Sequence, residues 1–222
     1  ACVQQAPVAE LRRWFQAKKA LPHPTKRAPP LRVKFFRNEF LITNMREPST
    51  GFRHEYPWVP YVKSDSIVIL QVCGWFHANY QGFEHNLKMA LGAIEKRIGR
   101  PDWARQVVVL SSNIGHRRCH NISAWPLKKA VNYSAPHSKK DNYSWHNINM
   151  LNSKAEEMVL SVGATYLDIT TMLSYRPDGH MESDCAHWCL PGAYDIAATL
   201  LHNAVVGTFD TPLAGLFRAR ES

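Results

Sequence analysis

The sequence contains no run of eighteen apolar residues, so we expect no membrane-spanning helix within its 222 residues. It also lacks a signal peptide, because it opens Ala-Cys-Val-Gln-Gln with neither an initiator Met nor an apolar stretch. This opening predicts a chain without its true start, which leaves room for a signal or membrane anchor upstream of Ala1. No internal repeat and no second domain are evident. We therefore expect a single, N-terminally incomplete domain over residues 1–222, with residues 1–30 as a Pro-rich surface connector.

Acidic residues are under-represented: 18 Asp and Glu stand against 27 Lys and Arg, for a formal net charge of +9. An anionic partner such as a polysaccharide would suit this excess, but a solvated basic surface explains the scattered cations as well. No DNA- or RNA-binding signature accompanies them, so no nucleic-acid partner is expected. An apolar content of 45% with 20% charged residues is typical of a globular chain and excludes a disordered one.

Cysteine is scarce but informative. The chain has five cysteines, and an odd number leaves at least one without a partner inside it. Three Asn-x-Ser sequons, at Asn121, Asn132 and Asn142, lie in polar sequence of the kind that accepts N-glycans. Sequons beside disulfide-forming cysteines favour the secretory pathway (Golgi lumen) or the extracellular space.

Apolar runs and their spacing predict strands that alternate with helices. Strands are expected at residues 32–42, 66–73, 106–113 and 165–169, the second and third of them buried on both faces. Helices are expected at 83–98, 147–162 and 193–206. Loops are expected at 43–64 and, as a polar insertion, at 114–146. The alternation predicts a parallel sheet covered on both faces, that is, a three-layer α/β/α domain.

The strongest chemical signal lies where a polar loop runs into the last predicted helix. Asp184 and His187 stand three residues apart there, and a tight turn would let the carboxylate fix the imidazole tautomer. The free ring nitrogen could then deprotonate a serine or a sugar hydroxyl. A bare Asp-x-x-His is more often a turn cap beside an ordinary loop histidine.

Two further interpretations concern neighbouring residues. A zinc site is the alternative for Cys119, Cys185, His187 and Cys189, although Cys-x-His-x-Cys is not the usual zinc spacing and we expect no metal. Among the tryptophans, Trp188 is the favoured candidate for stacking on a sugar, against the alternative of a partly buried core residue.

The stretch Arg176-Pro-Asp-Gly-His180, followed by Asp184-Cys-Ala-His-Trp-Cys-Leu-Pro-Gly-Ala-Tyr-Asp195, resembles the C-terminal block of the PC-esterase family. That family includes plant trichome-birefringence-like polysaccharide O-acetyltransferases and sialic-acid O-acetyltransferases. Two weaker similarities lie at residues 65–77 and 107–121, and the resemblance extends over 30–205.

The resemblance implies an SGNH-hydrolase-like (flavodoxin-like) parallel sheet and a Ser-His-Asp triad that transfers or cleaves acetyl esters without a cofactor. By matching position, Asp184 and His187 would be the triad acid and base. Gly74 and His77 would lie near the oxyanion or substrate site, with Trp188 beside them. No Gly-Asp-Ser occurs in the sequence, so the nucleophile and the first strand are expected outside this chain, and the chain alone is predicted to be inactive.

The same resemblance pairs Cys119 with Cys185 and leaves Cys2 and Cys189 to bond cysteines upstream of residue 1. The expected function is an O-acyl, most simply acetyl, transferase or esterase acting on glycan hydroxyls, with a glycan and an acyl donor as partners. The alternative is a non-catalytic family member that binds glycans or joins a partner protein in an assembly.

Overall fold

The computed structural model describes residues 33–36, 41, 43–47, 51–55, 58–71, 80–122, 126–131, 145–181 and 184–210. It separates two compact units, residues 1–36 and residues 37–222. In the first unit only residues 33–36 are described, and they form neither helix nor strand. The expected connector at 1–30 lies outside the described residues, so the single-domain division stays a prediction. The described helices and strands all lie in the second unit.

Three parallel strands form the centre of this unit: β3 (Val68–Gln71), β4 (Val107–Leu110) and β5 (Thr165–Leu167), in the order β3-β4-β5. Val68 pairs with Val107, and Val108 pairs with Thr165. All four residues of β4 are buried, as an apolar strand between two neighbours requires. The predicted parallel α/β sheet is confirmed, with shorter strands than the apolar runs suggested.

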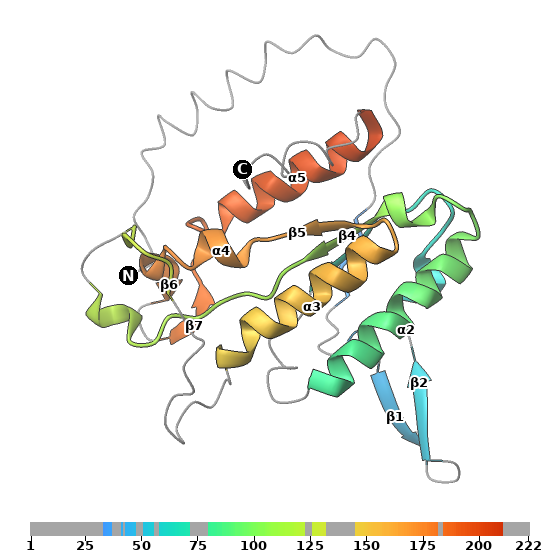
Figure 1. Ribbon diagram of the computed structural model, residues 1–222, viewed down its shortest axis with the longest axis horizontal. Coiled ribbons are helices and arrows are strands. Elements are labelled where there is room, and N and C mark those ends of the chain that lie inside the picture. The colour runs from blue at the N-terminus through green and yellow to red at the C-terminus, as the bar shows by residue number, and fades with distance from the viewer. Residues whose placement is uncertain are drawn as a thin grey trace. The chain divides into compact units, whose positions relative to one another are not determined.

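Helices cover both faces of this sheet. α2 (Tyr80–Ile98) connects β3 to β4, and α3 (Ile148–Ser161) precedes β5. Because parallel crossovers are right-handed and the strands follow one another in order, both helices fall on the same face. α5 (Asp195–Asp210) packs on β5 from the opposite side (Figure 1). The result is the three-layer α/β/α arrangement expected from the sequence.

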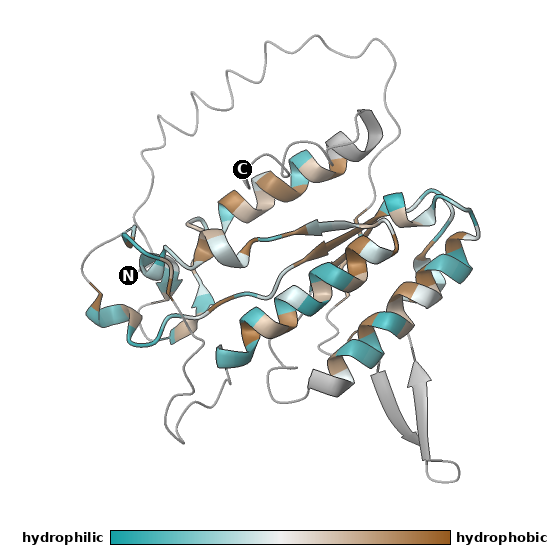
Figure 2. Ribbon diagram, in the orientation of Figure 1, coloured by the Kyte–Doolittle hydropathy of each residue, from teal (hydrophilic) through white to brown (hydrophobic). Residues whose placement is uncertain are grey.

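Most residues that were predicted to form the apolar stripes of the helices are buried. In α2, Leu87, Ala90, Leu91, Ile94 and Ile98 are each at most 4% exposed. Burying a side chain of Leu or Ile size contributes about 1.5–3 kcal/mol, so these contacts are a main source of the helix's stability. Figure 2 shows the consequence, with apolar strands between helices that alternate apolar and polar faces.

Two of the described helices, α2 and α3, end just before a glycine. Gly99 follows α2 with φ +67 and donates its N–H to the carbonyl of Glu95 at 2.9 Å. Gly163 follows α3 with φ +80. Both conformations lie in the left-handed region, which glycine adopts without steric cost.

Two predictions about the region before α2 are wrong. The strand expected at 32–42 is absent from its described residues, 33–36 and 41. The expected loop at 43–64 instead contains an antiparallel hairpin, β1 (Thr43–Glu47) with β2 (Gly51–Glu55). Gly51 indicated a loop, but it is the first residue of β2, since glycine is disfavoured in strand interiors and not at strand ends.

The burial of β3 also differs from expectation. Val68 and Leu70 are buried, whereas Ile69 is 45% exposed. Among the described strands β3 lies at the edge of its sheet, so its residues alternate between a packed and an open face.

The segment after β5 forms small elements in place of the expected loop. Helix α4 (Thr170–Leu173) and a 3-10 turn (Pro177–Gly179) precede a two-stranded antiparallel sheet, β6 (His180–Met181) with β7 (Asp184–Trp188). The polar stretch expected over 114–146 contains two 3-10 turns in its described part, Cys119–Asn121 and the start of Trp145–Asn147.

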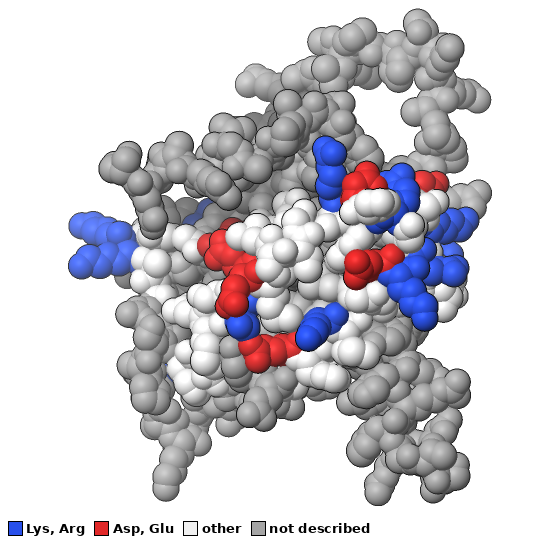
Figure 3. All heavy atoms as spheres, turned by 45° about the vertical axis from the view of Figure 1, so that its right-hand side comes forward, with Lys and Arg blue, Asp and Glu red and all other residues white. Residues whose placement is uncertain are grey.

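No described helix is long and apolar enough to cross a membrane. On the face shown in Figure 3, Lys and Arg side chains lie among Asp and Glu side chains. Among the described residues, Lys154 pairs with both Glu84 and Glu157. Part of the positive charge on this face therefore lies next to acidic groups.

Candidate active site

Strand β7 carries the Asp184–His187 pair that the sequence singled out. His187 Nδ1 donates a hydrogen bond to Asp184 Oδ2. Asp184 and His187 are three positions apart on one strand. Asp184 also accepts hydrogen bonds from the backbone that follows it. Its Oδ1 accepts the backbone N–H of Ala186 at 2.7 Å and that of His187 at 3.4 Å. One carboxylate oxygen therefore binds the His187 ring, and the other binds the backbone N–H groups of Ala186 and His187.

These bonds stabilise the charged form of the carboxylate. The hydrogen bond from the His187 ring is the main reason that the pKa of Asp184 is lowered, and the Ala186 N–H lowers it further. Asp184 is accordingly an anion at neutral pH and can balance an imidazolium on His187. The His187 side chain is 73% exposed, so its ring is accessible from solvent.

A disulfide ties β7 to the segment that follows β4. Cys119 and Cys185 are bonded, as the resemblance implied, over a sequence separation of 66. The Cys119 N–H donates to the Cys185 sulfur at 2.9 Å, and the His116 N–H donates to the Cys185 carbonyl at the same distance. Cys185 is adjacent to Asp184, so these links fix the carboxylate of the pair to the main sheet.

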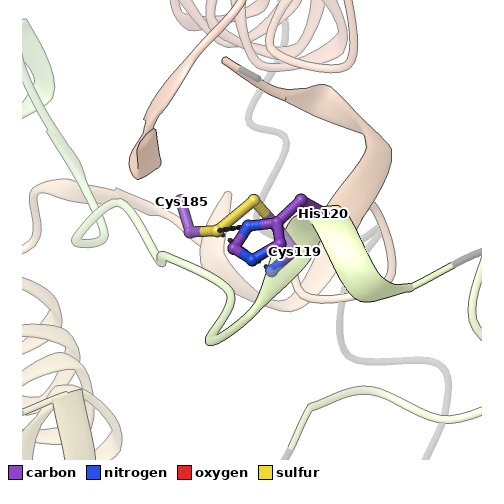
Figure 4. A group of neighbouring side chains, drawn as sticks. All are labelled: Cys119, His120 and Cys185. Atoms are coloured by element: carbon purple, nitrogen blue, oxygen red, sulfur yellow. Dashed lines mark hydrogen bonds between the residues drawn. A yellow bond between two sulfur atoms is a disulfide. The ribbon is translucent and has the colours of Figure 1, made fainter. Parts of the chain in front are cut away.

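The imidazole of His120 lies beside this disulfide (Figure 4), with Nδ1 at 3.7 Å from the Cys185 sulfur. Cys119, Cys185 and His120 form the group of potential metal-ligating atoms among the described residues. Zinc binds thiolates, and here both sulfurs belong to a disulfide. Cys189 is disulfide-bonded too, and its pairing with a cysteine upstream of residue 1 stays a prediction. The zinc interpretation of these cysteines therefore does not fit the structure.

An open pocket of about 230 Å³ adjoins His187. Its lining is contributed by the end of β7, the loop after β4 and the turn before α5: Asn113, Ala186, His187, Trp188, Leu190 and Tyr194. The pocket thus lies at the carboxyl ends of the parallel strands, where ligands bind in open α/β sheets.

A polar network closes one side of this pocket. Asn113 Oδ1 accepts from Tyr194 OH at 2.9 Å and from Gln71 Nε2 at 2.5 Å, and Gln71 Nε2 also donates to Tyr194 OH at 2.9 Å. Burial raises the pKa of the Tyr194 phenol, which keeps its proton available for Asn113. With its oxygen engaged twice, Asn113 has its amide N–H₂ group left for other partners.

Gln71, Asn113 and Tyr194 were not predicted as site residues from the sequence. Asn113 stands in a polar run that follows a buried strand, and Tyr194 lies inside the block that carried the resemblance. Those positions were the available signal, but their convergence on one network depends on the tertiary structure.

The remaining predicted site residues are distributed as follows. Trp188 lines the pocket, and its ring centroid lies 4.1 Å from that of His180. Asn121 is exposed, and its glycosylation stays a prediction. Gly74, His77, Cys2, Asn132 and Asn142 lie outside the described residues. Among the described residues, no serine hydroxyl forms a hydrogen bond with the His187 ring.

A parallel sheet with an oriented Asp–His pair beside a pocket at its carboxyl edge defines an α/β protein equipped for acid–base chemistry. The chain belongs to the PC-Esterase family, described as a GDSL/SGNH-like acyl-esterase family found in Pmr5 and Cas1p, whose model matches residues 54–204.

Two relatives are similar over part of their length. Xyloglucan O-acetyltransferase 4 of Populus trichocarpa is 24% identical over 158 residues, which cover 63% of this chain and 37% of the relative. Protein trichome berefringence-like 7 of Arabidopsis thaliana is 33% identical over 89 residues, covering 36% of this chain and 17% of the relative. The chain thus spans well under half the length of either relative. No solved structure matches it.

Proposed function

We propose that this chain supplies the acid–base part of an O-acyl, most simply acetyl, transferase or esterase that acts on glycan hydroxyls. Asp184 and His187 are the acid and base of a Ser-His-Asp triad, and the serine lies outside this sequence. Asp184 holds the imidazole by Nδ1, and Nε2 takes the proton from the serine hydroxyl as it attacks the acyl carbon. The same nitrogen then returns the proton to the leaving group.

The observation that carries this proposal is the oriented Asp184–His187 pair at the rim of the pocket. An ordinary turn cap would satisfy backbone N–H groups alone. Here the carboxylate satisfies the Ala186 N–H through one oxygen and reserves the other for the His187 ring. That division fixes one imidazole tautomer, which is what a general base requires.

Family membership and the names of the relatives support the reaction class and the glycan substrate. The disulfide supports an oxidising compartment, so we place the protein in the secretory pathway (Golgi lumen) or outside the cell. The pocket beside His187 has room for a small acyl group and part of a sugar ring, and Trp188 offers an aromatic surface in its lining.

The test uses the full-length protein from which this chain derives, incubated with an acetyl ester and then digested. A serine-containing peptide that carries the acetyl group, and that becomes unlabelled when a glycan acceptor is added, would support the proposal. If acetate is released from the ester but no serine peptide carries the acetyl group, an acyl-serine route is contradicted. Glycan binding without any ester cleavage would favour the non-catalytic alternative.

A further inference from the structure

Two further histidines, His116 and His180, form a pair next to His187 and have no role in the proposed triad. His116 follows β4 and is fully buried, and His180 opens β6 with 7% exposure. His116 Nδ1 lies 2.7 Å from His180 Nε2. The His180 ring packs against Trp188, with the ring centroids 4.1 Å apart.

Each outer nitrogen of this pair faces a main-chain carbonyl. His116 Nε2 lies 3.0 Å from the Ser174 carbonyl, and His180 Nδ1 lies 3.0 Å from the carbonyl of His187. A carbonyl oxygen only accepts hydrogen bonds, so both outer nitrogens must carry a proton. The short inner contact also needs a proton between its two nitrogens, since two lone pairs would repel each other.

The pair therefore holds three protons on two imidazoles, one more than two neutral rings contain. If the extra proton is lost, only two of the three hydrogen bonds can persist. The neutral pair must then give up the bond to Ser174 or the bond to His187, unless the two rings move apart and lose the inner bond instead. The Val131 N–H also approaches the Ser174 carbonyl, but at 3.4 Å it is a weak donor, so loss of the ring proton costs hydrogen bonding at either end.

We infer that His116 and His180 act as a proton-dependent positioning pair, which holds the main chain of His187 most firmly when the two imidazoles share one extra proton. The base function of His187 rests on the proposed function above, but the proton count and its effect on the His187 carbonyl do not. His180 is a positioning residue in this assignment, and its ring contributes nothing to the reacting atoms.

The groups around the two histidines determine in which pH range the extra proton is lost. Burial lowers the pKa of His116, and burial also lowers that of His180, to about 4, with further lowering by the charge of His116. Asp178 and Asp184 act in the opposite direction. The charged or titratable groups on the segments around the pair are Arg117, Arg118, His120, Arg176, Asp178, Asp184 and His187.

Arg176 binds Asp178 through both carboxylate oxygens, which weakens the help that Asp178 gives the imidazolium. The extra proton is therefore held in acid and lost as the pH rises toward neutral. The bond to the His187 carbonyl should accordingly be complete at acidic pH and partial above it.

The experiment follows ring and backbone ¹⁵N resonances of the folded chain, from neutral pH to the acid end of its stable range. The Trp188 amide nitrogen reports on the His187 carbonyl, because the two share a peptide bond. We expect three ring N–H signals from His116 and His180 in acid, and one of them should disappear as the pH rises. The Trp188 amide should shift with the same midpoint, below the ordinary histidine value.

The matched variants are His116→Gln and His180→Asn. Glutamine at 116 keeps a donor for Ser174 but removes the inner nitrogen, so His180 can donate to His187 at every pH. Asparagine at 180 keeps a donor for the His187 carbonyl without a titrating ring. Either variant should abolish the coupled step at Trp188.

A step that persists unchanged in a folded variant would overturn the inference. Fewer than three ring N–H signals in wild-type protein at its acid limit would overturn it without any variant. Failure of the proposed function looks different: activity would survive the loss of His187, and the titration of the pair would be unaffected.

Discussion

The imidazole of His180 lies 3.0 Å from the main-chain carbonyl of His187, to which its Nδ1 donates. The ring of the same His187 donates to Asp184. His187 is thus held at its side chain by a residue of its own strand and at its backbone by a residue of the neighbouring strand. That double attachment fixes the position of an exposed histidine that packing alone would leave free to turn.

Replacing His187 with alanine in the full-length protein should reduce kcat for acetyl-ester cleavage by about 10⁴-fold or more, because the proposed triad would lose its base. The circular dichroism spectrum should not change, since the side chain is 73% exposed, and the unfolding midpoint should fall only slightly through loss of the hydrogen bond to Asp184. His202→Ala, at another exposed histidine on α5, is the matched control and should retain full activity. Equal loss in both variants would show a general effect of the substitution.

Asp184→Asn should lower kcat about 10⁴-fold, because an amide nitrogen cannot accept the His187 Nδ1 proton and the wrong tautomer is favoured. It should also change stability in a pH-dependent way. Hydrogen bonding lowers the Asp184 pKa from its ordinary value of 3.8, so its charge stabilises the fold above that pH.

The difference in unfolding free energy between wild type and Asp184→Asn should be largest near neutral pH. It should shrink as the pH falls through the lowered pKa, when the wild-type carboxyl is protonated too. Denaturant titrations at a series of pH values measure it, and a constant difference across the acid range would contradict the assigned hydrogen bonds.

Removing the Cys119–Cys185 disulfide with the double substitution Cys119→Ser and Cys185→Ser should destabilise the chain by about 4 kcal/mol. This figure is the chain-entropy estimate for a sequence separation of 66. Urea unfolding without reductant measures the loss. With reductant present, wild type and variant should unfold at the same concentration, and a remaining gap would assign the loss to packing of the sulfur atoms.

Two glycine-to-alanine substitutions should have opposite effects. A Cβ on Gly115 would lie 2.3 Å from the Trp145 ring and 2.8 Å from the Cys185 carbonyl, so Gly115→Ala should cost about 1–3 kcal/mol. Gly92, inside α2, has nothing within 4 Å of such an atom, and Gly92→Ala should stabilise by about 0.5–1 kcal/mol. Thermal unfolding of both variants checks the signs, and a stable Gly115→Ala protein would contradict the close packing after β4.

The sequence by itself determined the elements whose signals are local. The apolar run at 106–113 predicted β4, and the apolar stripe of α2 predicted the buried face of that helix, because periodicity reports directly on burial. The Asp184–His187 contact was also predictable, since the two residues are three apart and the motif around them is specific. The β1–β2 hairpin was missed because Pro and Gly mark strand junctions as readily as loops.

Only the tertiary structure decided which distant residues meet at the site. Gln71, Asn113 and Tyr194 come from three segments, and His116 and His180 are 64 positions apart. No periodicity encodes such pairs, because the register of parallel strands and the packing of β6 and β7 against the loop after β4 bring them together. The number of protons on the histidine pair follows from the same arrangement, since it depends on which carbonyl groups the fold places opposite each ring.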